Sequence, residues 1–337
     1  MKPVYEIRSG ALAGFNLLVP QLGGDPSALL TRVGLPADCV RRPDILIPIA
    51  TLTELLNLCA DELRCNDFGL RLANMQGVRI LGALGKLLLH DGDLGAALAA
   101  THRYMVLHNQ ADHWRIQMDG DELIAQRIDH FEEPLAAQQY RELAMGAGYR
   151  LIQDLAGEDI RPRRVTFRQQ PVSPQQCYRD FFNCDVLFGE ERDSLVFDAE
   201  ILQRPLRRPG SRLNHYFEEF TQQLLREYRG DIALQVRTLI LQTLGAQQHG
   251  LAQIAELINI PPRTLQRRLR EAGTSFKQLL QDARMETARW HLRASSIDIN
   301  LLSASLGYTD ISAFSKAFRV VHGCSPLQWR KKHRQPG

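Results

Sequence analysis

A helical pattern occurs twice in the last third of the 337-residue chain and constrains its fold more than any other feature. The apolar positions of the two copies correspond at an offset of 48 or 49 residues: Ile254, Ala255, Ile258, Leu265 and Leu269 match Leu302, Ser303, Leu306, Phe314 and Phe318. Apolar residues three and four apart favour amphipathic helices. Each copy therefore predicts a short buried helix, a tight turn and a second helix.

The polar side of the second helix is repeated as well. Residues spaced i, i+3, i+4 and i+7 form one face in each copy: Arg263, Gln266, Arg267 and Arg270 in the first, and Ser312, Ser315, Lys316 and Arg319 in the second. Arginine can bond guanine O6 and N7, and glutamine can bond adenine N6 and N7, so the first face can read bases. Both copies predict helix-turn-helix units that enter the major groove of DNA.

The segments around these helices have suitable turn and cap residues. Asn259-Ile260-Pro261-Pro262 forms the first turn, and proline is tolerated where a helix begins. Gly307 suits the second turn, and Asp310 is expected to cap the helix that follows. A long helix from Phe276 to about Arg293, capped by Thr274-Ser275, separates the units. Its length of roughly 27 Å is close to one turn of B-DNA, ~34 Å, so one chain can span two successive major grooves.

Positive charge is concentrated in the same region. Residues 231–337 carry 15 Lys and Arg against 7 Asp and Glu, a net charge of +8, whereas residues 1–230 carry −5. A cationic excess confined to one unit is typical of nucleic-acid binders, and an even spread of the overall +3 would imply nothing. A solvated basic face without a partner is the alternative interpretation of the charge alone.

The length of the chain indicates two domains, and its cysteine usage indicates a protein without disulfides. The chain exceeds what one core usually organises. Its six cysteines include no CxxC pair and are expected to be free thiols. The N-terminus, MKPVYEIRSG, lacks the apolar run of a signal peptide, and charged residues interrupt the most hydrophobic stretch, Ile80 to Ala100. We therefore expect no export and no membrane span.

The N-terminal part predicts an α+β domain, with a small sheet behind a helical lead-in. Periodic leucines between Gly10 and Leu98 favour helices, and strands are expected only later. Trp114 to Met118 and Glu122 to Ile128 alternate around Asp119-Gly120-Asp121, as in a hairpin. A helix from about Glu133 to Ala156 follows. Three more strands are expected at Val165 to Arg168, Val186 to Phe188 and Leu195 to Asp198.

A proline- and arginine-rich segment, Gln203 to Arg212, has the composition of an exposed connection. We therefore expect the α+β domain at residues 1–202, a linker and connecting helix at 203–230, and an all-α domain with two helix-turn-helix units at 231–334. In the connecting helix, apolar residues step by 4, 3 and 4: Leu213, Phe217, Phe220 and Leu224. This seam packs either within its own subunit or against a second one.

Two regions carry a family resemblance. LQRRLREAGTSFKQLLQDARMETARWHLRAS, followed by INLLSASLGYTDISAFSKAFRVVHGCSPLQWR, resembles the DNA-binding domain of the AraC/XylS family of bacterial transcriptional regulators. The resemblance covers roughly residues 231–333, with the glycines, the F-S-K-A-F core and the G-x-S-P end in register. Upstream, FGLRLANMQGVRILGALGKLLLHDGDLGAAL and DVLFGEERDSLVFDAEILQRPL resemble the arabinose-binding-like N-terminal domain of one branch of that family. That label does not imply arabinose.

The resemblance implies a one-component regulator whose N-terminal domain senses a small molecule and mediates self-association. It maps base contacts onto both units: Arg263, Gln266 and Arg267 in the first, and Ile311, Ser312, Ser315 and Lys316 in the second. Three positions depart from the family pattern. Ser303 stands where a small alanine is usual, Tyr308 where phenylalanine is usual, and Pro261 where a capping serine is common.

We expect a cytoplasmic, nucleoid-associated homodimer that binds promoter DNA and contacts RNA polymerase, and the family resemblance favours an activator over a repressor. Phosphates are expected to be held by other residues of the two units and by the Lys331-Lys332 tail: Thr264, Arg268, Arg270, Arg319, Lys331 and Lys332. No cofactor and no metal ion are expected. The effector, the target genes and the sign of regulation cannot be deduced from the sequence.

Metal-binding and architectural roles have weaker support. His102, His108 and His113 lie close in the sequence but share no helical face, so ordinary histidines are favoured over a metal site. An architectural protein that coats DNA without sequence preference fits poorly with outward-facing Gln266 and Ser315.

An enzymatic first domain is the main alternative class, and we do not expect it. The chain has no G-x-S-x-G, P-loop or dinucleotide-binding motif. Cys177 and Cys184 are the positions to inspect for an alkyl-accepting thiol, although such cysteines are usually packing residues. Arg161, Arg163 and Arg164 can meet an effector carboxylate, but solvated surface is the favoured interpretation.

Overall fold

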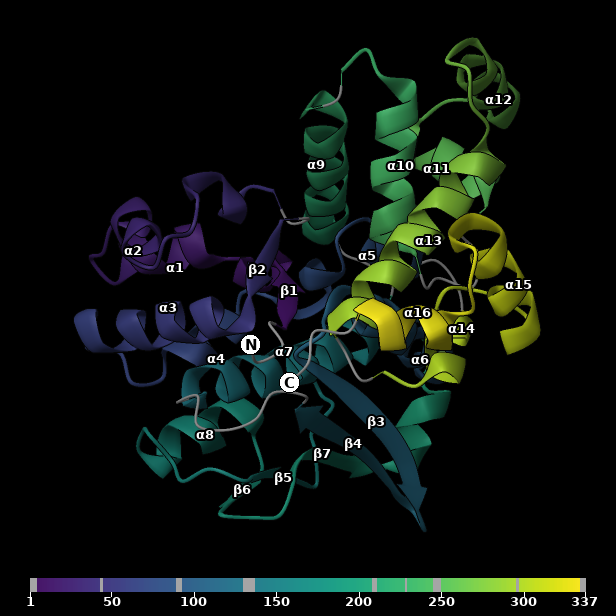
Figure 1. The fold of residues 1–337 in the computed structure, drawn as a ribbon. Coiled ribbons are helices and arrows are strands. Elements are labelled where there is room, and N and C mark those ends of the chain that lie inside the picture. The colour runs from purple at the N-terminus through teal and green to yellow at the C-terminus, as the bar shows by residue number, and fades with distance from the viewer. Residues whose placement is uncertain are drawn as a thin grey trace.

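The computed structural model describes residues 5–42, 45–88, 93–129, 137–207, 211–227, 229–244, 250–294 and 297–333. In this part of the chain, helices surround a small sheet in the N-terminal region, and the residues from 211 onward form helices without strands (Figure 1). This arrangement is the α+β domain followed by an all-α domain that the sequence predicts.

The main sheet has five strands in the order β3-β4-β7-β5-β6. They are β3 (Asp112–Asp119), β4 (Glu122–Asp129), β5 (Arg164–Phe167), β6 (Asp185–Phe188) and β7 (Asp193–Asp198). All neighbours are antiparallel except β5 and β6. The hairpin prediction is confirmed, because Asp119 pairs with Glu122 and Gly120 takes a φ of +59° in the turn between them.

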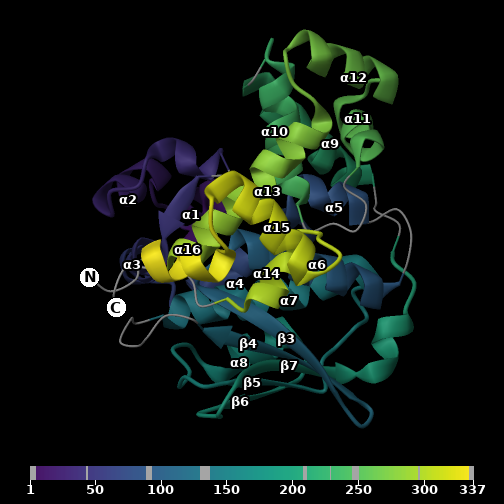
Figure 2. The same cartoon turned by 45° about the vertical axis from the view of Figure 1, so that its right-hand side comes forward.

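Helices α6 and α7 contact the main sheet, and most other helices of the N-terminal domain lie beyond them (Figure 2). The helices of this domain are α1 (Phe15–Gln21), α2 (Pro26–Arg32), α3 (Ile49–Glu62), α4 (Phe68–Ala73), α5 (Ala83–Leu88), α6 (Leu94–His108), α7 (Gln138–Ala156) and α8 (Gln175–Phe182). Short 3-10 helices occur at Ser9–Leu12, Ala37–Val40, Gly77–Leu81 and Ala199–Gln203. The predicted helix and three predicted strands after the hairpin are confirmed within the described residues, and residues 133–136 lie outside them.

The prediction that strands occur only after the helical lead-in is wrong. β1 (Glu6–Arg8) pairs antiparallel with β2 (Leu46–Pro48). Each strand has only three residues, too few for an alternating pattern to be recognised. A residue distant in the sequence stabilises this pair, since Gln110 N donates a hydrogen bond to Glu6 O at 3.0 Å. Its formation therefore depends on tertiary contacts.

Helix α7 forms the centre of the N-terminal domain. One side, including Tyr149 and Ile152, packs in a core with sheet residues such as Phe197. The other side, including Tyr140 and Leu143, packs in a second core with α1 to α4. A helix buried on both sides carries few charges that water can reach, and those it does carry need partners within the protein.

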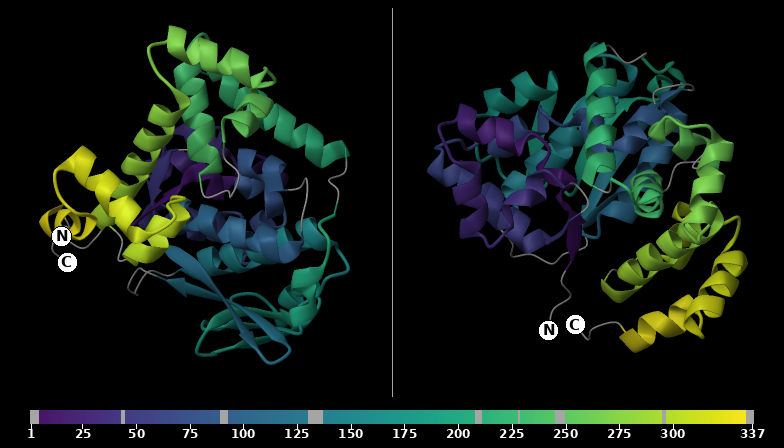
Figure 3. Two further views of the ribbon diagram at one scale, coloured as in Figure 1. Left: turned by 90° about the vertical axis from the view of Figure 1, so that its right-hand side faces the viewer. Right: turned by 90° about the horizontal axis from the view of Figure 1, so that it is seen from above.

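The C-terminal helices lie along one side of the N-terminal domain (Figure 3). They are α9 (Ser211–Glu227), α10 (Ile232–Thr243), α11 (Leu251–Ile258), α12 (Pro262–Glu271), α13 (Phe276–Ala294), α14 (Ile299–Ser305), α15 (Ile311–His322) and α16 (Pro326–His333). Direct hydrogen bonds join the two parts: Trp290 Nε1 donates to Glu6 Oε2 at 2.8 Å, and Gln110 Nε2 donates to Trp290 O at 3.0 Å. The long helix α13 is thereby attached to β1.

The apolar seam of the connecting helix packs within its own subunit at the two positions whose side chains are described. Phe217 is fully buried in the sheet core, and a Cβ at Gly85 would lie 2.5 Å from its ring. Phe220 is half-buried beside Gly82. The side chains of Leu213 and Leu224 lie outside the described set.

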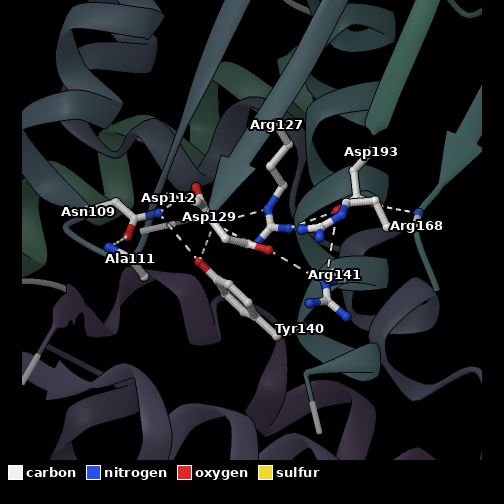
Figure 4. Close-up of polar contacts among 9 residues, drawn as sticks. All are labelled: Asn109, Ala111, Asp112, Arg127, Asp129, Tyr140, Arg141, Arg168 and Asp193. Carbon is white, nitrogen blue, oxygen red and sulfur yellow. Dashed lines mark hydrogen bonds and ion pairs between the residues drawn. The ribbon is translucent and has the colours of Figure 1, made fainter. Parts of the chain in front are cut away.

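A buried ion network joins the sheet to α7 (Figure 4). The guanidinium of Arg127, which is fully buried in β4, contacts three carboxylates: Asp112 at 3.0 Å, Asp129 at 2.5 Å and Asp193 at 3.3 Å. From α7, Tyr140 donates to Asp112 Oδ2 at 2.6 Å, and Arg141 lies 3.6 Å from Asp129. Burial raises the pKa of the Asp129 carboxyl, and Arg127 acts in the opposite direction. These charges depend on one another because water cannot solvate them.

Replacing Arg127 with glutamine should destabilise the fold by about 3–5 kcal/mol, because three buried carboxylates lose their shared cation. Urea unfolding of the full chain measures this change. Arg163→Gln is the matched control, since Arg163 is exposed and pairs with Asp121 and Asp198 at the surface. Equal losses of stability in both variants would contradict a dominant role for the buried network.

A second buried acidic side chain lies on the opposite side of α7. Glu142 is fully buried, and its Oε1 accepts a hydrogen bond of 2.5 Å from the Tyr178 hydroxyl. Its Oε2 has no hydrogen-bond partner among the described residues. Burial raises the pKa of the Glu142 carboxyl from 4.5 to about 8, with Asp67 adding to the rise and the Tyr178 hydrogen bond opposing it. The side chain is therefore protonated at neutral pH.

The raised pKa of Glu142 predicts a pH dependence of stability. Between pH 4.5 and about 8 the folded state holds one proton that the unfolded state has released. Stability should therefore fall as pH rises through this window. Glu142→Gln removes the titration, so its free energy of unfolding should decline less than that of the unmodified protein between pH 5 and pH 8 in urea titrations. Parallel declines would show that Glu142 does not titrate in this range.

Candidate nucleic-acid interface and effector cavity

The first helix-turn-helix unit consists of α11 and α12. Leu265 and Leu269 of α12 are buried in the same core as Ile254 and Ala255 of α11. Asn259 ends α11 in the left-handed conformation, with a φ of 60°. The chain then runs extended through Pro261, which is the N-cap, and α12 begins at Pro262. The fixed φ of proline suits this start, so the missing capping serine does not delay the helix.

The second unit, α14 and α15, repeats this geometry with different residues. Gly307 takes a φ of 78°, at the position equivalent to Asn259. Asp310 is the N-cap, as predicted: its Oδ1 accepts from Ala313 N at 2.7 Å. That hydrogen bond lowers the pKa of the Asp310 carboxyl. Both units therefore place a left-handed residue and an extended N-cap at equivalent positions before the exposed helix.

Two departures from the family pattern have structural explanations. The hydroxyl of Ser303, which is buried, donates to Asp310 O at 3.2 Å, so its polar group is satisfied inside the turn. The hydroxyl of Tyr308 donates to Gln281 Oε1 at 3.2 Å, and Arg284 lies 4.9 Å from the centre of the same ring. These contacts attach the second unit to α13.

Most of the predicted DNA-contacting side chains are exposed on α12, α15 and α16: Arg263, Gln266, Arg267, Arg268, Arg270, Ile311, Ser312, Lys316, Arg319, Lys331 and Lys332. Thr264 and Ser315 are half-buried. Ile311 is 39% exposed. A shallow depression runs along α15 and includes Ser312, Ser315 and Lys316.

Arg267, one of the exposed cations of α12, has only a weak ion-pair partner. Within the part of the chain that the structure describes, Arg267 Nη1 lies 3.0 Å from Glu271 Oε1, one helical turn away, and both side chains are more than half exposed. Exposed i,i+4 pairs of this kind contribute only a few tenths of a kcal/mol. Arg267 can therefore leave Glu271 for a stronger acceptor.

Helix α13 separates the two units. Ser275 Oγ caps it, as predicted, by accepting from Gln278 N at 3.2 Å. Its 19 residues span roughly 28 Å. α12 lies at one end of α13, and α14 and α15 lie at the other (Figures 1 and 2).

The N-terminal domain contains a cavity of about 170 Å³ between the sheet, α6 and α7. We call it the N-terminal cavity. Its walls also include Tyr216 and Phe220 of α9 and Gln242 of α10, which belong to the C-terminal part of the chain. No sequence signal marks this cavity, because its lining residues come from many elements and share no spacing.

A second, larger space of about 670 Å³ lies between the N-terminal domain and α13 and α14. We call it the interdomain hollow. It is lined by His102 and His113 together with His291, and burial lowers the pKa of His102. The His108 side chain lies outside the described set. Among the described residues, no group of three His, Cys, Asp or Glu side chains is arranged to hold a metal ion.

The other candidate residues have ordinary structural roles. Arg164 makes a two-pronged ion pair with Glu122 at 2.6 and 2.7 Å, and Arg163 pairs with Asp121, so both arginines already have carboxylate partners. Arg161 is exposed. Burial raises the pKa of the Cys184 thiol to about 12, with Asp185 adding to the rise, which disfavours the thiolate that an alkyl acceptor needs.

None of the helices among the described residues is both long and apolar enough to cross a bilayer.

Comparisons with known proteins match both parts of the chain. Residues 23–206 match the model for the N-terminal arabinose-binding domain of AraC transcription regulator, and residues 254–332 match a helix-turn-helix domain. The HTH-type transcriptional regulator VirS of Mycobacterium tuberculosis is 28% identical over 327 residues, covering 96% of each chain. The ornithine utilization regulator of Pseudomonas aeruginosa is 25% identical over 265 residues, covering 78% of each chain.

Among solved structures, the transcriptional regulator CdpR of Pseudomonas aeruginosa matches with a TM-score of 0.41 at 21% sequence identity. This match covers 90% of the present chain and 96% of CdpR.

Proposed function

The chain belongs to the AraC family of HTH-type transcriptional regulators, and we propose that α12 and α15 read promoter DNA under the control of an effector bound by the first domain. The observation that supports this proposal best is the pair of matched units. Each has a left-handed residue and an extended N-cap before an exposed polar helix, and α13, roughly 28 Å long, lies between the two units.

We assign base contacts to the exposed faces of the two reading helices: Arg263, Gln266 and Arg267 in α12, and Ile311, Ser312, Ser315 and Lys316 in α15. In this assignment Ile311 contacts a thymine methyl group. Phosphates are held by other residues of α12 and α15 and by the basic end of α16: Thr264, Arg268, Arg270, Arg319, Lys331 and Lys332. The first unit, which carries more arginine, contributes most of the discrimination between bases.

Mapping of the DNA bound in the source bacterium tests the function as a whole. We expect a few sharp peaks that share two short motifs one helical turn apart. We propose that the protein acts on the nucleoid in the cytoplasm and activates transcription through contact with RNA polymerase. Deleting the gene should therefore lower the transcription of genes beside those peaks. Diffuse occupancy without a shared motif would contradict specific regulation and would favour an architectural role.

Replacing Arg267 with alanine should weaken binding to the mapped operator by ~1–3 kcal/mol, roughly 5- to 150-fold, and relax the base preference at one position. Fluorescence anisotropy with operator and scrambled duplexes measures both effects. Arg268→Ala is the matched control on the same helix. It should weaken binding to both duplexes equally and reduce the salt slope by about 1. If Arg267→Ala keeps the operator-to-scrambled ratio of the unmodified protein, the base assignment is wrong.

We also propose a homodimer, because two copies double the contact length and allow an effector to act through relative orientation. Sedimentation of the full chain should show a dimer at working concentration, or a dimer that forms on operator DNA. A monomer under both conditions would remove this part of the proposal. Residues 1–202 and the connecting helix at 203–230 are the two regions that can supply the interface.

A further inference from the structure

The N-terminal cavity has the dimensions of a small-molecule site. Its volume of about 170 Å³ slightly exceeds that of an apolar cavity of roughly 150 Å³ that holds benzene. A ring of that size, or a chain of about six carbons, therefore fits it. A sugar would leave its hydroxyl groups facing apolar walls, which is unfavourable.

Most of the cavity wall is hydrocarbon. Sheet residues Trp114, Leu123 and Leu195 form one side, and Leu143 and Ile152 of α7 form the other. Asp112 is the one carboxylate among the described lining residues. It already accepts hydrogen bonds from Tyr140 at 2.6 Å and Asn109 at 2.9 Å and contacts Arg127, so it is not available to attract a ligand cation.

A group of cations and phenols lines another part of the wall. The guanidinium of Arg79 lies 5.3 Å from the centre of the Tyr216 ring. Tyr104 is close to both Tyr216 and Arg8: burial raises its pKa to about 12, Arg8 opposes the rise and Tyr216 adds to it. Arg8, Arg79, Tyr104 and Tyr216 therefore lie together along the cavity.

Arg79 has no carboxylate within ion-pair distance among the described residues, although it lies near enough to Asp154 to oppose the burial that raises the pKa of that carboxyl. Its hydrogen bond to Met75 O is long at 3.4 Å. The nearby Asp154 carboxylate instead accepts from Val78 N at 2.9 Å. A half-buried guanidinium beside an apolar cavity is well suited to bind a carboxylate with charge-assisted hydrogen bonds.

We propose that the N-terminal cavity is the effector site and that it takes a small monocarboxylic acid with an aliphatic or aromatic body. The body lies between the sheet and α7, and the carboxylate binds Arg79 with Arg8 nearby. This inference rests on the proposed function, in which the first domain senses an effector, and it adds the chemical class of that effector.

The N-terminal cavity is also lined by residues of α9 and α10, the helices that precede the DNA-binding units. Tyr216 and Phe220 belong to α9, and Gln242 belongs to α10, which contacts α12 and α13 directly. Gly82 lies where these helices meet the N-terminal domain: it has a φ of +52°, and a Cβ there would lie 2.8 Å from the Gln242 side chain and 3.0 Å from Phe220. A ligand that contacts these walls favours one position of α9 and α10 and thereby biases the DNA-binding units.

Calorimetric titration of the full chain tests the ligand class. The probes are hexanoate and phenylacetate, each compared with its neutral amide. Both acids should bind more tightly than their amides by about tenfold or more, the effect of a hydrogen bond to a charged group. Arg79→Gln should remove this preference, and Arg161→Gln, which changes an exposed arginine outside the cavity, should keep it. Equal binding of acids and amides, or no binding of either acid, overturns the proposal.

Two further variants keep the result interpretable. Arg8→Gln replaces Arg79→Gln if the latter does not give the circular dichroism spectrum of the unmodified protein. Ala99→Phe partly fills the interdomain hollow, which Ala99 lines, without entering the N-terminal cavity. If Ala99→Phe abolishes acid binding and Arg79→Gln does not, the site is the hollow and the proposal is wrong.

Operator affinity is measured on the same samples, with and without saturating acid. A shift in operator affinity on adding acid supports the cavity as the effector site. Acid binding that leaves operator affinity unchanged overturns that role. Loss of operator specificity in the unmodified protein, with acid binding intact, would instead contradict the proposed function and leave the ligand class standing.

Discussion

The N-terminal domain depends on one buried arginine. Arg127 connects carboxylates from β3, β4 and β7, and the same network reaches α7 through Tyr140 and Arg141. Ionic contacts of this kind have fixed directions and distances, unlike apolar packing, so the network sets how far the sheet lies from α7. Asp112 and Tyr140 also line the N-terminal cavity, which can therefore stay open beside a rigid wall without collapsing.

The DNA-binding part reaches a defined geometry by a different route. Each unit fixes the angle between its helices with a left-handed residue and an extended N-cap, at Asn259 and Pro261 in the first and at Gly307 and Asp310 in the second. Side chains on α13, such as Arg284 against Tyr308, then orient the second unit on the spacer helix. The sequences of the two turns differ, but the backbone conformations that they require are the same.

Features encoded by local periodicity could be predicted from the sequence. The two units, the long spacer helix, the hairpin at Gly120 and the caps at Ser275 and Asp310 all follow from residues within a few positions of one another. The β1–β2 pair could not be predicted, because its three-residue strands depend on Gln110, about a hundred residues away. The N-terminal cavity cannot be predicted for the same reason: Arg8, Arg79 and Tyr216 meet only after folding.

The packing of α9 determines how ligand binding in the N-terminal domain can affect DNA binding. An exposed linker helix would separate the domains energetically, and a bound ligand could then change DNA binding only through the oligomer. Phe217 of α9 is instead buried in the sheet core, and Gln242 of α10, the helix after α9, lines the N-terminal cavity. In the proposed mechanism both domains contact one ligand space, so ligand and operator affinities are coupled within a single chain. That coupling must be reciprocal: if the ligand raises operator affinity, the operator raises ligand affinity by the same factor.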